Sequence, residues 1–383
     1  MKILWHSNAP WAPTGYGNQT SIFVPRLKAL GHEMGISAFW GIQGGMGGMS
    51  GGIPVYPPGK RDRYGMDIIG AHANHFGADI VITLVDAWVM HRQDFGNKPW
   101  IPWYPVDSEP LPRDVFTSVN DASDRIVFSK HGEKMTKEAG LSCRYVPHGV
   151  ETKVFTPGDM NEARKRIGFP QDVFLVGMVA ANKGYPSRKA FDPQFKAFAL
   201  FKKEHPDALL YVHSDIAQNG ENGGVNLMAL ADFHGLRPGT DIVFCDQYTN
   251  LIGFPVPYMV DAYRSMDVHM LVSMGEGFGI PIVEAQSCGT PVITGDWTSM
   301  SELTFSGWKV AKEDADPSWT PLGAVQYQPR YGAILDALRC AYTMKGNQQY
   351  RSRARDGALP YDADKVTEKY WKPVLETIEE NLK

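Results

Sequence analysis

Short apolar runs alternate with amphipathic stretches along the first 150 residues of the chain. Between the first two runs, the stretch "NQTSIFVPRLKALGH" ends at Gly31 and predicts a helix over 18–32. Strands separated by helices in this way are typical of a parallel sheet that helices cover on both faces. The predicted strands of this half lie at 2–7, 33–40, 78–85, 98–106, 124–130 and 144–150.

The same alternation begins again after residues 151–170, where turn residues and charges replace the apolar runs. A helix is predicted at 192–206, and a last helix at about 365–383 is a candidate to pack back on the first domain. Because 383 residues exceed one ordinary core, we predict an α/β protein of two domains, 1–155 and 156–364, each with a parallel sheet. The predicted strands of the second half lie at 172–180, 208–215, 241–246, 267–273 and 290–295.

Composition then narrows the class of protein. The chain is 43% hydrophobic and 21% charged, which is typical of a globular protein, and its net charge of −4 does not favour bulk binding to nucleic acid or anionic membranes. Its four cysteines are far apart and lack zinc-site spacing, which favours reduced thiols. The start "MKILWHSN" does not resemble a signal peptide, and no run approaches the roughly 20 apolar residues of a membrane helix, so we expect a soluble, cytoplasmic protein.

One segment, "GGMGGMSGG" at 44–52, is rich in glycine with methionine interleaved. We interpret it as a mobile surface loop, because such composition gives a flexible chain. A loop placed over a cleft between the domains would instead be able to close on an acceptor.

The first candidate site is "PTGYGNQT" at 13–20, directly after the first strand. Gly15 and Gly17 would let the backbone approach a ligand, and a helix that begins here would offer free N–H groups to an anion. A turn without a ligand explains the two glycines equally well. A nicotinamide-dependent enzyme is disfavoured, because Thr20 stands at the third glycine position of G-x-G-x-x-G and the second strand ends in "ISAFWG" without an acidic residue.

The second candidate site is "ANKGYPSRKAF" at 181–191, which follows the first strand of the second half. Open α/β sheets bind ligands at the carboxyl ends of their strands. Arg188 and Lys189 are therefore candidates to neutralise a diphosphate, and Lys183 is a lesser one. A solvated basic turn is the alternative interpretation.

The third candidate site is "GEGFGIPIVEA" at 275–285. Carboxylates are rarely buried without a partner, yet Glu276 and Glu284 stand in an apolar setting. Pro281 suits the first turn of a helix, whose leading amides, those of residues 278–280, would point at an anion. A loop glutamate and a helix glutamate can then hold the two hydroxyl-bearing ends of one ligand with phosphate between them. The alternative interpretation is that the two glutamates cap the helix or form salt bridges. The surrounding glycines favour the ligand-binding interpretation over this alternative.

The stretch "SMGEGFGIPIVEAQSCGTPVI" resembles the E-x7-E signature of retaining GT-B glycosyltransferases of family 4. The stretches "IVFSKHGEKMTKEAG", "VPHGVETKVFTP", "AYRSMDVHMLVS" and "SMSEL" resemble the pattern of the same family in the expected order. More faintly, "LWHSNAPWAPTGYGNQT" is similar to members carried by tailed phages. The resemblance covers most of the chain and implies two Rossmann-like domains, with the active site in the cleft between them.

Carried over to this chain, the resemblance implies that Glu276 contacts hydroxyls of the donor sugar and that Glu284 contacts the ribose of a nucleotide such as a UDP- or GDP-sugar. Lys189, preceded by Arg188, corresponds to the phosphate-binding lysine of the family. The remaining implied donor-binding residues are Gly15, Tyr16, Gly17, Asn182, Gly277, Phe278, Gly279 and Ile280.

Two positions depart from the family. Asn182 stands where an arginine is usual, so either Arg188 compensates or diphosphate binding is weaker. Asp107 stands in "WYPVDSEPLP", where many members have a histidine near the reacting face of the sugar. It is a candidate to bind a sugar hydroxyl, to stabilise positive charge at the anomeric carbon or to orient the acceptor, and a role as nucleophile stays open.

The resemblance implies transfer of a hexosyl or pentosyl group with retained configuration. Protein cations and amides would stabilise the leaving diphosphate, so we expect no metal and no cofactor. Two DxD-like triplets, Asp314-Ala-Asp316 and Asp362-Ala-Asp364, lie in polar connecting segments and are interpreted as turn or capping residues.

The rival interpretations are a GT-B-fold epimerase or phosphorylase and a non-catalytic protein that binds nucleotide sugars. The acceptor stays open among a glycan, a lipid, a small molecule, a protein and a modified DNA base, and so does the oligomeric state.

Overall fold

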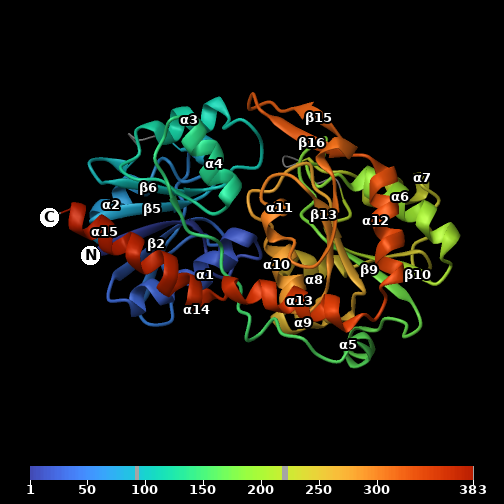
Figure 1. The fold of residues 1–383 in the computed structure, drawn as a ribbon. Helices are drawn as coiled ribbons and strands as arrows, with labels where there is room; N and C mark the ends of the chain where they lie inside the picture. Colours follow the sequence, from blue (N-terminus) through green and yellow to red (C-terminus); the bar gives the residue numbers. More distant parts are fainter. Residues whose placement is uncertain (91–94, 218–222, 383) are drawn as a thin grey trace. The chain divides into compact units, whose positions relative to one another are not determined.

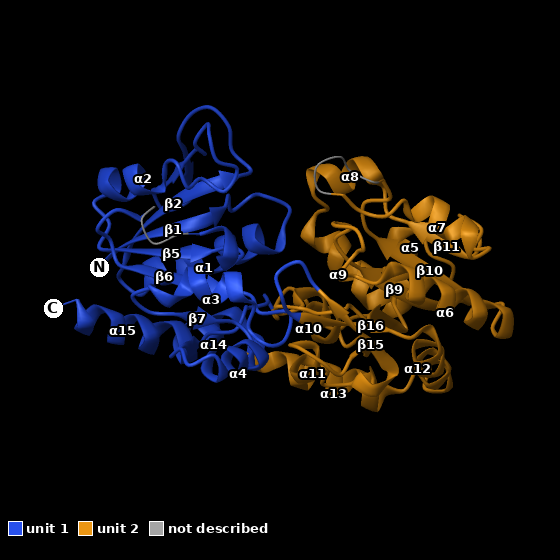
Figure 2. Cartoon of the chain, turned by 90° about the horizontal axis from the view of Figure 1, so that it is seen from above, with its two compact units in different colours: residues 1–151, 320–324, 361–383 blue, residues 152–319, 325–360 orange. Residues whose placement is uncertain are grey.

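The computed structural model describes residues 1–90, 95–217 and 223–382. The chain forms two compact units, which Figure 2 shows in different colours. Unit 1 comprises residues 1–151, 320–324 and 361–383, and unit 2 comprises residues 152–319 and 325–360. The division thus falls at Glu151, whereas the sequence analysis placed it at 155. In the described part of the chain, no helix combines the length and the apolar character needed to cross a bilayer.

Unit 1 is built on an eight-stranded sheet with the order β3-β4-β2-β1-β5-β6-β7-β8 (Figure 1). Neighbouring strands are parallel except for the pair β3–β4. Every predicted strand of this half is present, because most of the apolar runs are buried in the sheet, although β8 is only partly buried. The strands are β1 (Lys2–Asn8), β2 (Glu33–Trp40), β3 (Gly47–Met49), β4 (Ile53–Tyr56), β5 (Ile80–Leu84), β6 (Trp100–Tyr104), β7 (Ile126–Val127) and β8 (Arg144–Tyr145).

The interpretation of residues 44–52 as a loop throughout was wrong. Gly47–Met49 forms β3, which pairs antiparallel with β4. Gly51 and Gly52 have φ values of 83° and 74°, a backbone region that glycine enters readily, and they make the tight connection between the two strands. Part of the glycine-rich segment therefore forms β3, the edge strand of the sheet.

Helix α1 (Gly15–Ala29) begins three residues before its predicted start at Asn18. The side chain of Thr14 accepts a hydrogen bond from the amide of Gly17 and so caps the helix at this earlier point. The other helices among residues 1–90 and 95–151 are α2 (Ile69–Phe76), the short 3-10 helix η1 (Ala87–Val89), α3 (Arg113–Asn120) and α4 (Lys130–Glu138).

The end of the chain belongs to unit 1 and is helical, as α14 (Ala363–Val366), a π-helical turn η6 (Thr367–Trp371) and α15 (Lys372–Asn381). Trp371 is fully buried, and its ring centroid lies 5.7 Å from that of Trp5, 4.9 Å from that of Trp103 and 5.9 Å from that of Phe23. The C-terminal helix therefore supplies a large side chain to the core that β1, β6 and α1 form.

Unit 2 is built on a six-stranded parallel sheet with the order β11-β10-β9-β12-β13-β14. Five of its strands were predicted, and β14 was not. The strands are β9 (Phe174–Val179), β10 (Ala208–His213), β11 (Ile242–Phe244), β12 (Val268–Leu271), β13 (Val292–Gly295) and β14 (Gly307–Val310). An antiparallel hairpin of β15 (Ala315–Trp319) and β16 (Val325–Pro329) was not predicted either.

The helices of unit 2 are α5 (Met160–Ile167), α6 (Phe191–Glu204), α7 (Leu227–Phe233), α8 (Gln247–Ile252), α9 (Val256–Ser265), α10 (Ile280–Ser287), α11 (Met300–Leu303), α12 (Tyr331–Thr343) and α13 (Gln348–Ala358). A buried ion pair connects α5 to the sheet, since Arg164 lies 2.8 Å from Asp267 and the side chains are 2% and 4% exposed. Asp267 also accepts the amide of Leu175, which secures the start of β9 and the residue before β12.

Candidate functional site

The loop between β12 and α10 carries the first of the two predicted glutamates. Gly279 precedes the helix with a φ of 108°, and a Cβ atom there would lie 2.8 Å from a side-chain carbon of Ile282. A glycine is therefore required at this helix start. The turn places Glu276 beneath the beginning of α10, where its side chain is 5% exposed.

Both oxygens of the Glu276 carboxylate are held by protein donors. Oε1 accepts hydrogen bonds from the ammonium group of Lys189 and from the hydroxyl of Ser273, the latter at 2.6 Å. Oε2 lies 3.1 Å from a guanidinium nitrogen of Arg188, which also donates to the carbonyl of Gly275. The structure thus brings three predicted site residues together in one cluster, Glu276 with Arg188 and Lys189.

The charge of Glu276 follows from these neighbours. Burial by itself raises the pKa of the carboxyl group, but the positive charges of Arg188 and Lys189 and the hydrogen bonds from Lys189 and Ser273 outweigh it and lower the pKa to about 2. Glu276 is therefore ionised at neutral pH. Its ionisation depends on the two cations, so the three side chains form one electrostatic unit.

The backbone of the neighbouring loop fixes the two cations. Gln194, fully buried on α6, donates to the carbonyls of Lys189 and Ala190 and accepts the amide of Val272 at the end of β12. The amide of Met274 donates to the carbonyl of Arg188 at 2.8 Å. The loop that carries Arg188 and Lys189 is therefore tied directly to the loop that carries Glu276.

Three more residues support Glu276, and sequence reasoning missed them. The amide of Glu276 donates to Oγ1 of Thr298 at 3.1 Å, and the hydroxyl of Ser299 donates to the carbonyls of Glu276 and Phe278. Thr298 has a φ of 52°, which costs a β-branched residue about 1–3 kcal/mol. The signal for Ser299 was present in "SMSEL", whereas nothing in the sequence pattern marked Thr298 or Ser273.

Glu284 lies one turn into α10 and has different surroundings. Its Oε2 accepts a hydrogen bond of 2.8 Å from the hydroxyl of Tyr263, a fully buried residue of α9. Burial raises the pKa of Glu284 to about 7, although the hydrogen bond from Tyr263 lowers it. The two glutamates of the motif therefore differ in charge at neutral pH, because cations surround only the first.

Asn182 follows β9 and is hydrogen-bonded within unit 2. Its side-chain amide donates to the carbonyls of Asp215 and Val225 at 2.9 and 2.7 Å and accepts the amide of Val225 at 2.9 Å. Both amide hydrogens are therefore used within unit 2. A diphosphate contact by this NH2 group would break these bonds, and the predicted ligand contact of Asn182 stays a prediction.

The predicted residues at the start of α1 belong to unit 1. A Cβ atom on Gly17 would lie 2.3 Å from the carbonyl oxygen of Ala12, so close packing explains this glycine. Its amide is taken by Thr14, which corrects the expectation that this N–H group faces an anion. The hydroxyl of Tyr16 donates to Asp86 at 3.2 Å, and the structure gives Gly15 as the first residue of the helix.

Asp107 also belongs to unit 1 and follows β6, at the carboxyl end of the strand as predicted. It is half-buried, and the carbonyl of the next residue, Ser108, lies 3.0 Å from Nε2 of His131. The glutamates and the two cations belong to unit 2, so the grouping of both sets in one active site stays a prediction.

The two DxD-like triplets have partners of their own. Asp316 pairs with Arg330, Asp362 caps α14, and Asp364 pairs with Arg26. Among residues 1–90, 95–217 and 223–382, no group of three or more His, Cys, Asp or Glu side chains is arranged to hold a metal ion. The capping role expected for these triplets is therefore present at Asp362.

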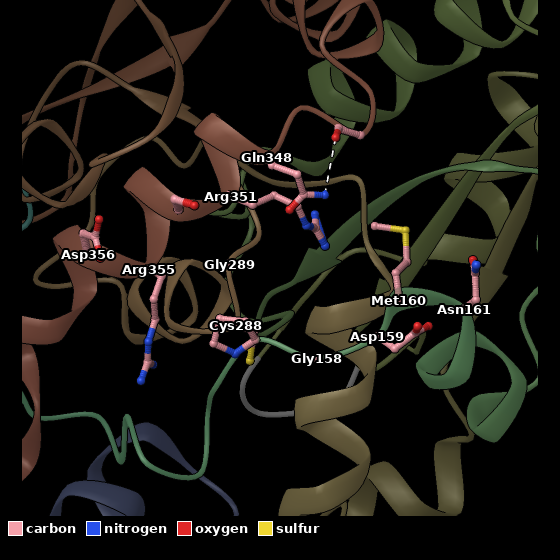
Figure 3. Close-up of a pocket in the computed structure, with 13 residues that line it drawn as sticks. Gly158, Asp159, Met160, Asn161, Cys288, Gly289, Gln348, Arg351, Arg355 and Asp356 are labelled. Atoms are coloured by element: carbon pink, nitrogen blue, oxygen red, sulfur yellow. Dashed lines mark hydrogen bonds between the residues drawn. The ribbon is translucent and has the colours of Figure 1, made fainter.

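Unit 2 also has a pocket of about 510 Å³ at the other end of α10. Figure 3 shows Cys288 and Gly289 between side chains of α13, including Arg351 and Arg355, and the start of α5. One guanidinium nitrogen of Arg355 donates to the carbonyls of Thr152, Phe155 and Ser287. None of the predicted site residues lines this pocket, so it is separate from the Glu276 cluster.

The residues of the Glu276 cluster lie in a segment of the sequence that matches a family of known proteins. The family described as "Glycosyl transferases group 1" matches residues 173–318, which include Arg188, Lys189, Glu276 and Glu284. D-inositol 3-phosphate glycosyltransferase of Acidothermus cellulolyticus is 33% identical over 158 residues, 39% of this chain and 32% of that protein. D-inositol 3-phosphate glycosyltransferase 1 of Catenulispora acidiphila is 33% identical over 194 residues, 50% of this chain and 41% of that protein. The chain thus spans well under half the length of these curated relatives.

Comparison of structures covers the whole chain. Sucrose-phosphate synthase of Thermosynechococcus elongatus has a TM-score of 0.76 at 16% identity, with 100% of both chains covered. Anabaena HepE, solved in complex with UDP-glucose, has a TM-score of 0.69 at 16% identity, with 99% of this chain and 100% of that chain covered. At this identity the likeness shows the fold, and the predicted GT-B fold with two Rossmann-like units is confirmed.

Proposed function

We propose that the protein is a retaining, metal-independent glycosyltransferase of family 4 that moves a sugar from a nucleotide-diphosphate sugar to an acceptor hydroxyl. The buried cluster of Glu276, Arg188 and Lys189 carries this proposal. It provides two fixed positive charges beside the amino end of α10, within the region that matches a glycosyltransferase family. Fixed charges of this kind are what a departing diphosphate requires.

The chemistry follows from the charge that develops during transfer. When the bond from the anomeric carbon to the diphosphate breaks, negative charge grows on the phosphate oxygens and positive charge on the sugar ring. Arg188, Lys189 and the leading amides of α10 would stabilise the phosphate. Glu276 holds both cations while the donor site is empty, so bound phosphate would share them with the carboxylate. The leaving phosphate would take the proton of the acceptor hydroxyl on the same face of the sugar, which retains the configuration.

Glu276 and Glu284 would divide the donor between them. Glu284 would accept hydrogen bonds from the ribose hydroxyls. Glu276 would face the sugar and hold Arg188 and Lys189 in position. Asp107 is the proposed unit 1 contact to the sugar or the acceptor. UDP-sugars are the first donors to test, because HepE was solved with UDP-glucose, and GDP-sugars are the second. Inositol phosphate belongs in the acceptor panel because of the names of the sequence relatives.

The test is release of nucleotide from a panel of UDP- and GDP-sugars, with and without acceptors, followed by mass spectrometry. Lys189→Ala should lose most of the rate, because the leaving phosphate loses a cation. Lys196→Ala is the matched control, since Lys196 is an exposed lysine of α6, the helix that begins two residues after Lys189, and lies over the ring of Tyr331. Tight nucleotide binding without turnover on any acceptor would favour a binding protein, and a change of donor sugar without transfer would favour an epimerase.

A further inference from the structure

The hydroxyl of Tyr263 is directed at the second glutamate of the motif. Tyr263 is 0% exposed, and its hydroxyl donates to Oε2 of Glu284 at 2.8 Å. Among the residues that the structure describes, Oε1 of Glu284 has no hydrogen-bond partner. Tyr263 thus holds the carboxylate of Glu284 through Oε2, and Oε1 can accept a hydrogen bond from a ligand.

The position of this tyrosine is fixed by its surroundings. The hydroxyl of Thr290, before β13, donates to the backbone carbonyl of Tyr263 at 2.7 Å. The ring lies edge-on to Phe155 at 6.0 Å and to His269 at 5.8 Å between centroids. A ring restrained on both sides keeps its hydroxyl at one point, and a group held by its neighbours can orient a ligand-binding side chain.

We propose that Tyr263 is a positioning residue that holds Oε2 of Glu284, so that Oε1 accepts a ribose hydroxyl of the nucleotide. The proposal rests on the proposed function, because it takes the nucleotide as the ligand of Glu284. Tyr263 does not touch the ligand itself. It restricts the rotamer of Glu284, and its hydrogen bond favours the ionised form, in which Oε1 can accept a hydrogen bond from a ribose hydroxyl.

The same contacts make nucleotide binding depend on pH. Burial raises the pKa of Glu284 to about 7, so the empty site is partly protonated at neutral pH. The other titratable group of α10 near this pair is Cys288, whose pKa burial also raises. The guanidinium groups of Arg264 on α9 and of Arg355 and Arg351 on α13 act on Cys288, and the ring of His269 on β12 faces that of Tyr263. Ribose hydroxyls favour the charged carboxylate, so affinity rises with pH through about 7 and then levels off.

The experiment is the pH dependence of UDP and GDP affinity, measured by calorimetry on the full chain with Tyr263→Phe. The variant loses the hydrogen bond that lowers the pKa of Glu284, so the rise in affinity should shift to higher pH. A shift of about one unit weakens binding roughly fivefold at pH 7 and leaves it nearly equal above pH 9. Tyr258→Phe is the matched control, because it removes a hydroxyl of the same helix that contacts Tyr211.

A 2′,3′-dideoxynucleotide separates the possible outcomes. It lacks the hydroxyls that would donate to Glu284 but keeps the same phosphates, which also gain charge with pH. Its affinity should therefore rise less near pH 7 than that of its parent, and Tyr263→Phe should leave its profile unchanged. If UDP or GDP binds and Tyr263→Phe leaves the pH profile unchanged, the role of Tyr263 is refuted. If the dideoxynucleotide shows the same profile as its parent, the ribose is not the ligand of Glu284. If neither nucleotide binds the unaltered protein, the proposed function fails, and this inference fails with it.

Discussion

Replacing Glu276 by glutamine removes the negative charge from a buried cluster with two cations. The pKa of Glu276 falls from 4.5 to about 2 on folding, which corresponds to about 3 kcal/mol of stability. A carboxylate with a lowered pKa contributes this stability above pH 4.5 and loses it as the pH falls toward 2. Glu276→Gln should therefore destabilise the region around α10 by about 3 kcal/mol at pH 7, and the difference from the unaltered protein should narrow below pH 4.5.

The assay is hydrogen exchange of the amides in residues 272–280, because two units need not unfold together and a global midpoint would mix them. Glu313→Gln is the control, since Glu313 is exposed in the same unit. Pyrophosphate or UDP should increase the protection of these amides from exchange more in Glu276→Gln than in the unaltered protein. In the variant, Arg188 and Lys189 no longer pair with a carboxylate and are available to bind phosphate. Equal exchange in the two proteins at pH 7 would refute the interpretation of the cluster as one electrostatic unit.

Three further predictions concern Glu284, metal and acid. Glu284→Ala should weaken UDP or GDP binding, measured by calorimetry, by roughly 1.5–3 kcal/mol, since the ribose hydroxyls lose a charged acceptor. Glu276→Gln should mainly lower turnover. Equal losses of nucleotide affinity in the two variants would contradict these separate roles. Donor hydrolysis should survive a chelator. If the chelator abolishes hydrolysis and added magnesium restores it, a metal ion and not Arg188, Lys189 and the amides of α10 neutralises the diphosphate. Burial lowers the pKa of His6 to about 4, so His6 should contribute a loss of up to about 3 kcal/mol in the stability of unit 1 between pH 6.5 and 4, measured by hydrogen exchange of the amides of β1, and His6→Gln should remove that share of the pH dependence.

The sequence predicted the strands of the two sheets well, because most are apolar runs that the fold buries. It missed the four-residue strand β4, the edge strands β3 and β14 and the hairpin of β15 and β16, which are short, and several of which contain glycine or exposed polar side chains. Such short elements depend on pairing with a neighbour, which single-sequence patterns do not show.

The motif around Glu276 was visible because its glycines and carboxylates are unusual in an apolar stretch. The contacts of the motif were less visible. Tyr263 and Thr298 lie 21 and 22 residues from the glutamates that they contact, so no local spacing pairs them. The position of Asn182 after β9 suggested a ligand contact, which stays a prediction, and nothing in the sequence indicated that its amide donates to two carbonyls of the same unit.

The helix that ends the chain gives unit 1 an order of assembly. Residues 1–151 lack the Trp371 side chain that fills the core beside Trp5 and Trp103. On the ribosome, residues 152–319 and 325–360 of unit 2 are all translated before Trp371 is added. The first 151 residues therefore expose an unfilled apolar surface to chaperones while nearly all of the second unit is being made. A stop codon shortly before Trp371 would leave unit 2 complete in sequence and unit 1 without the side chain that closes its core.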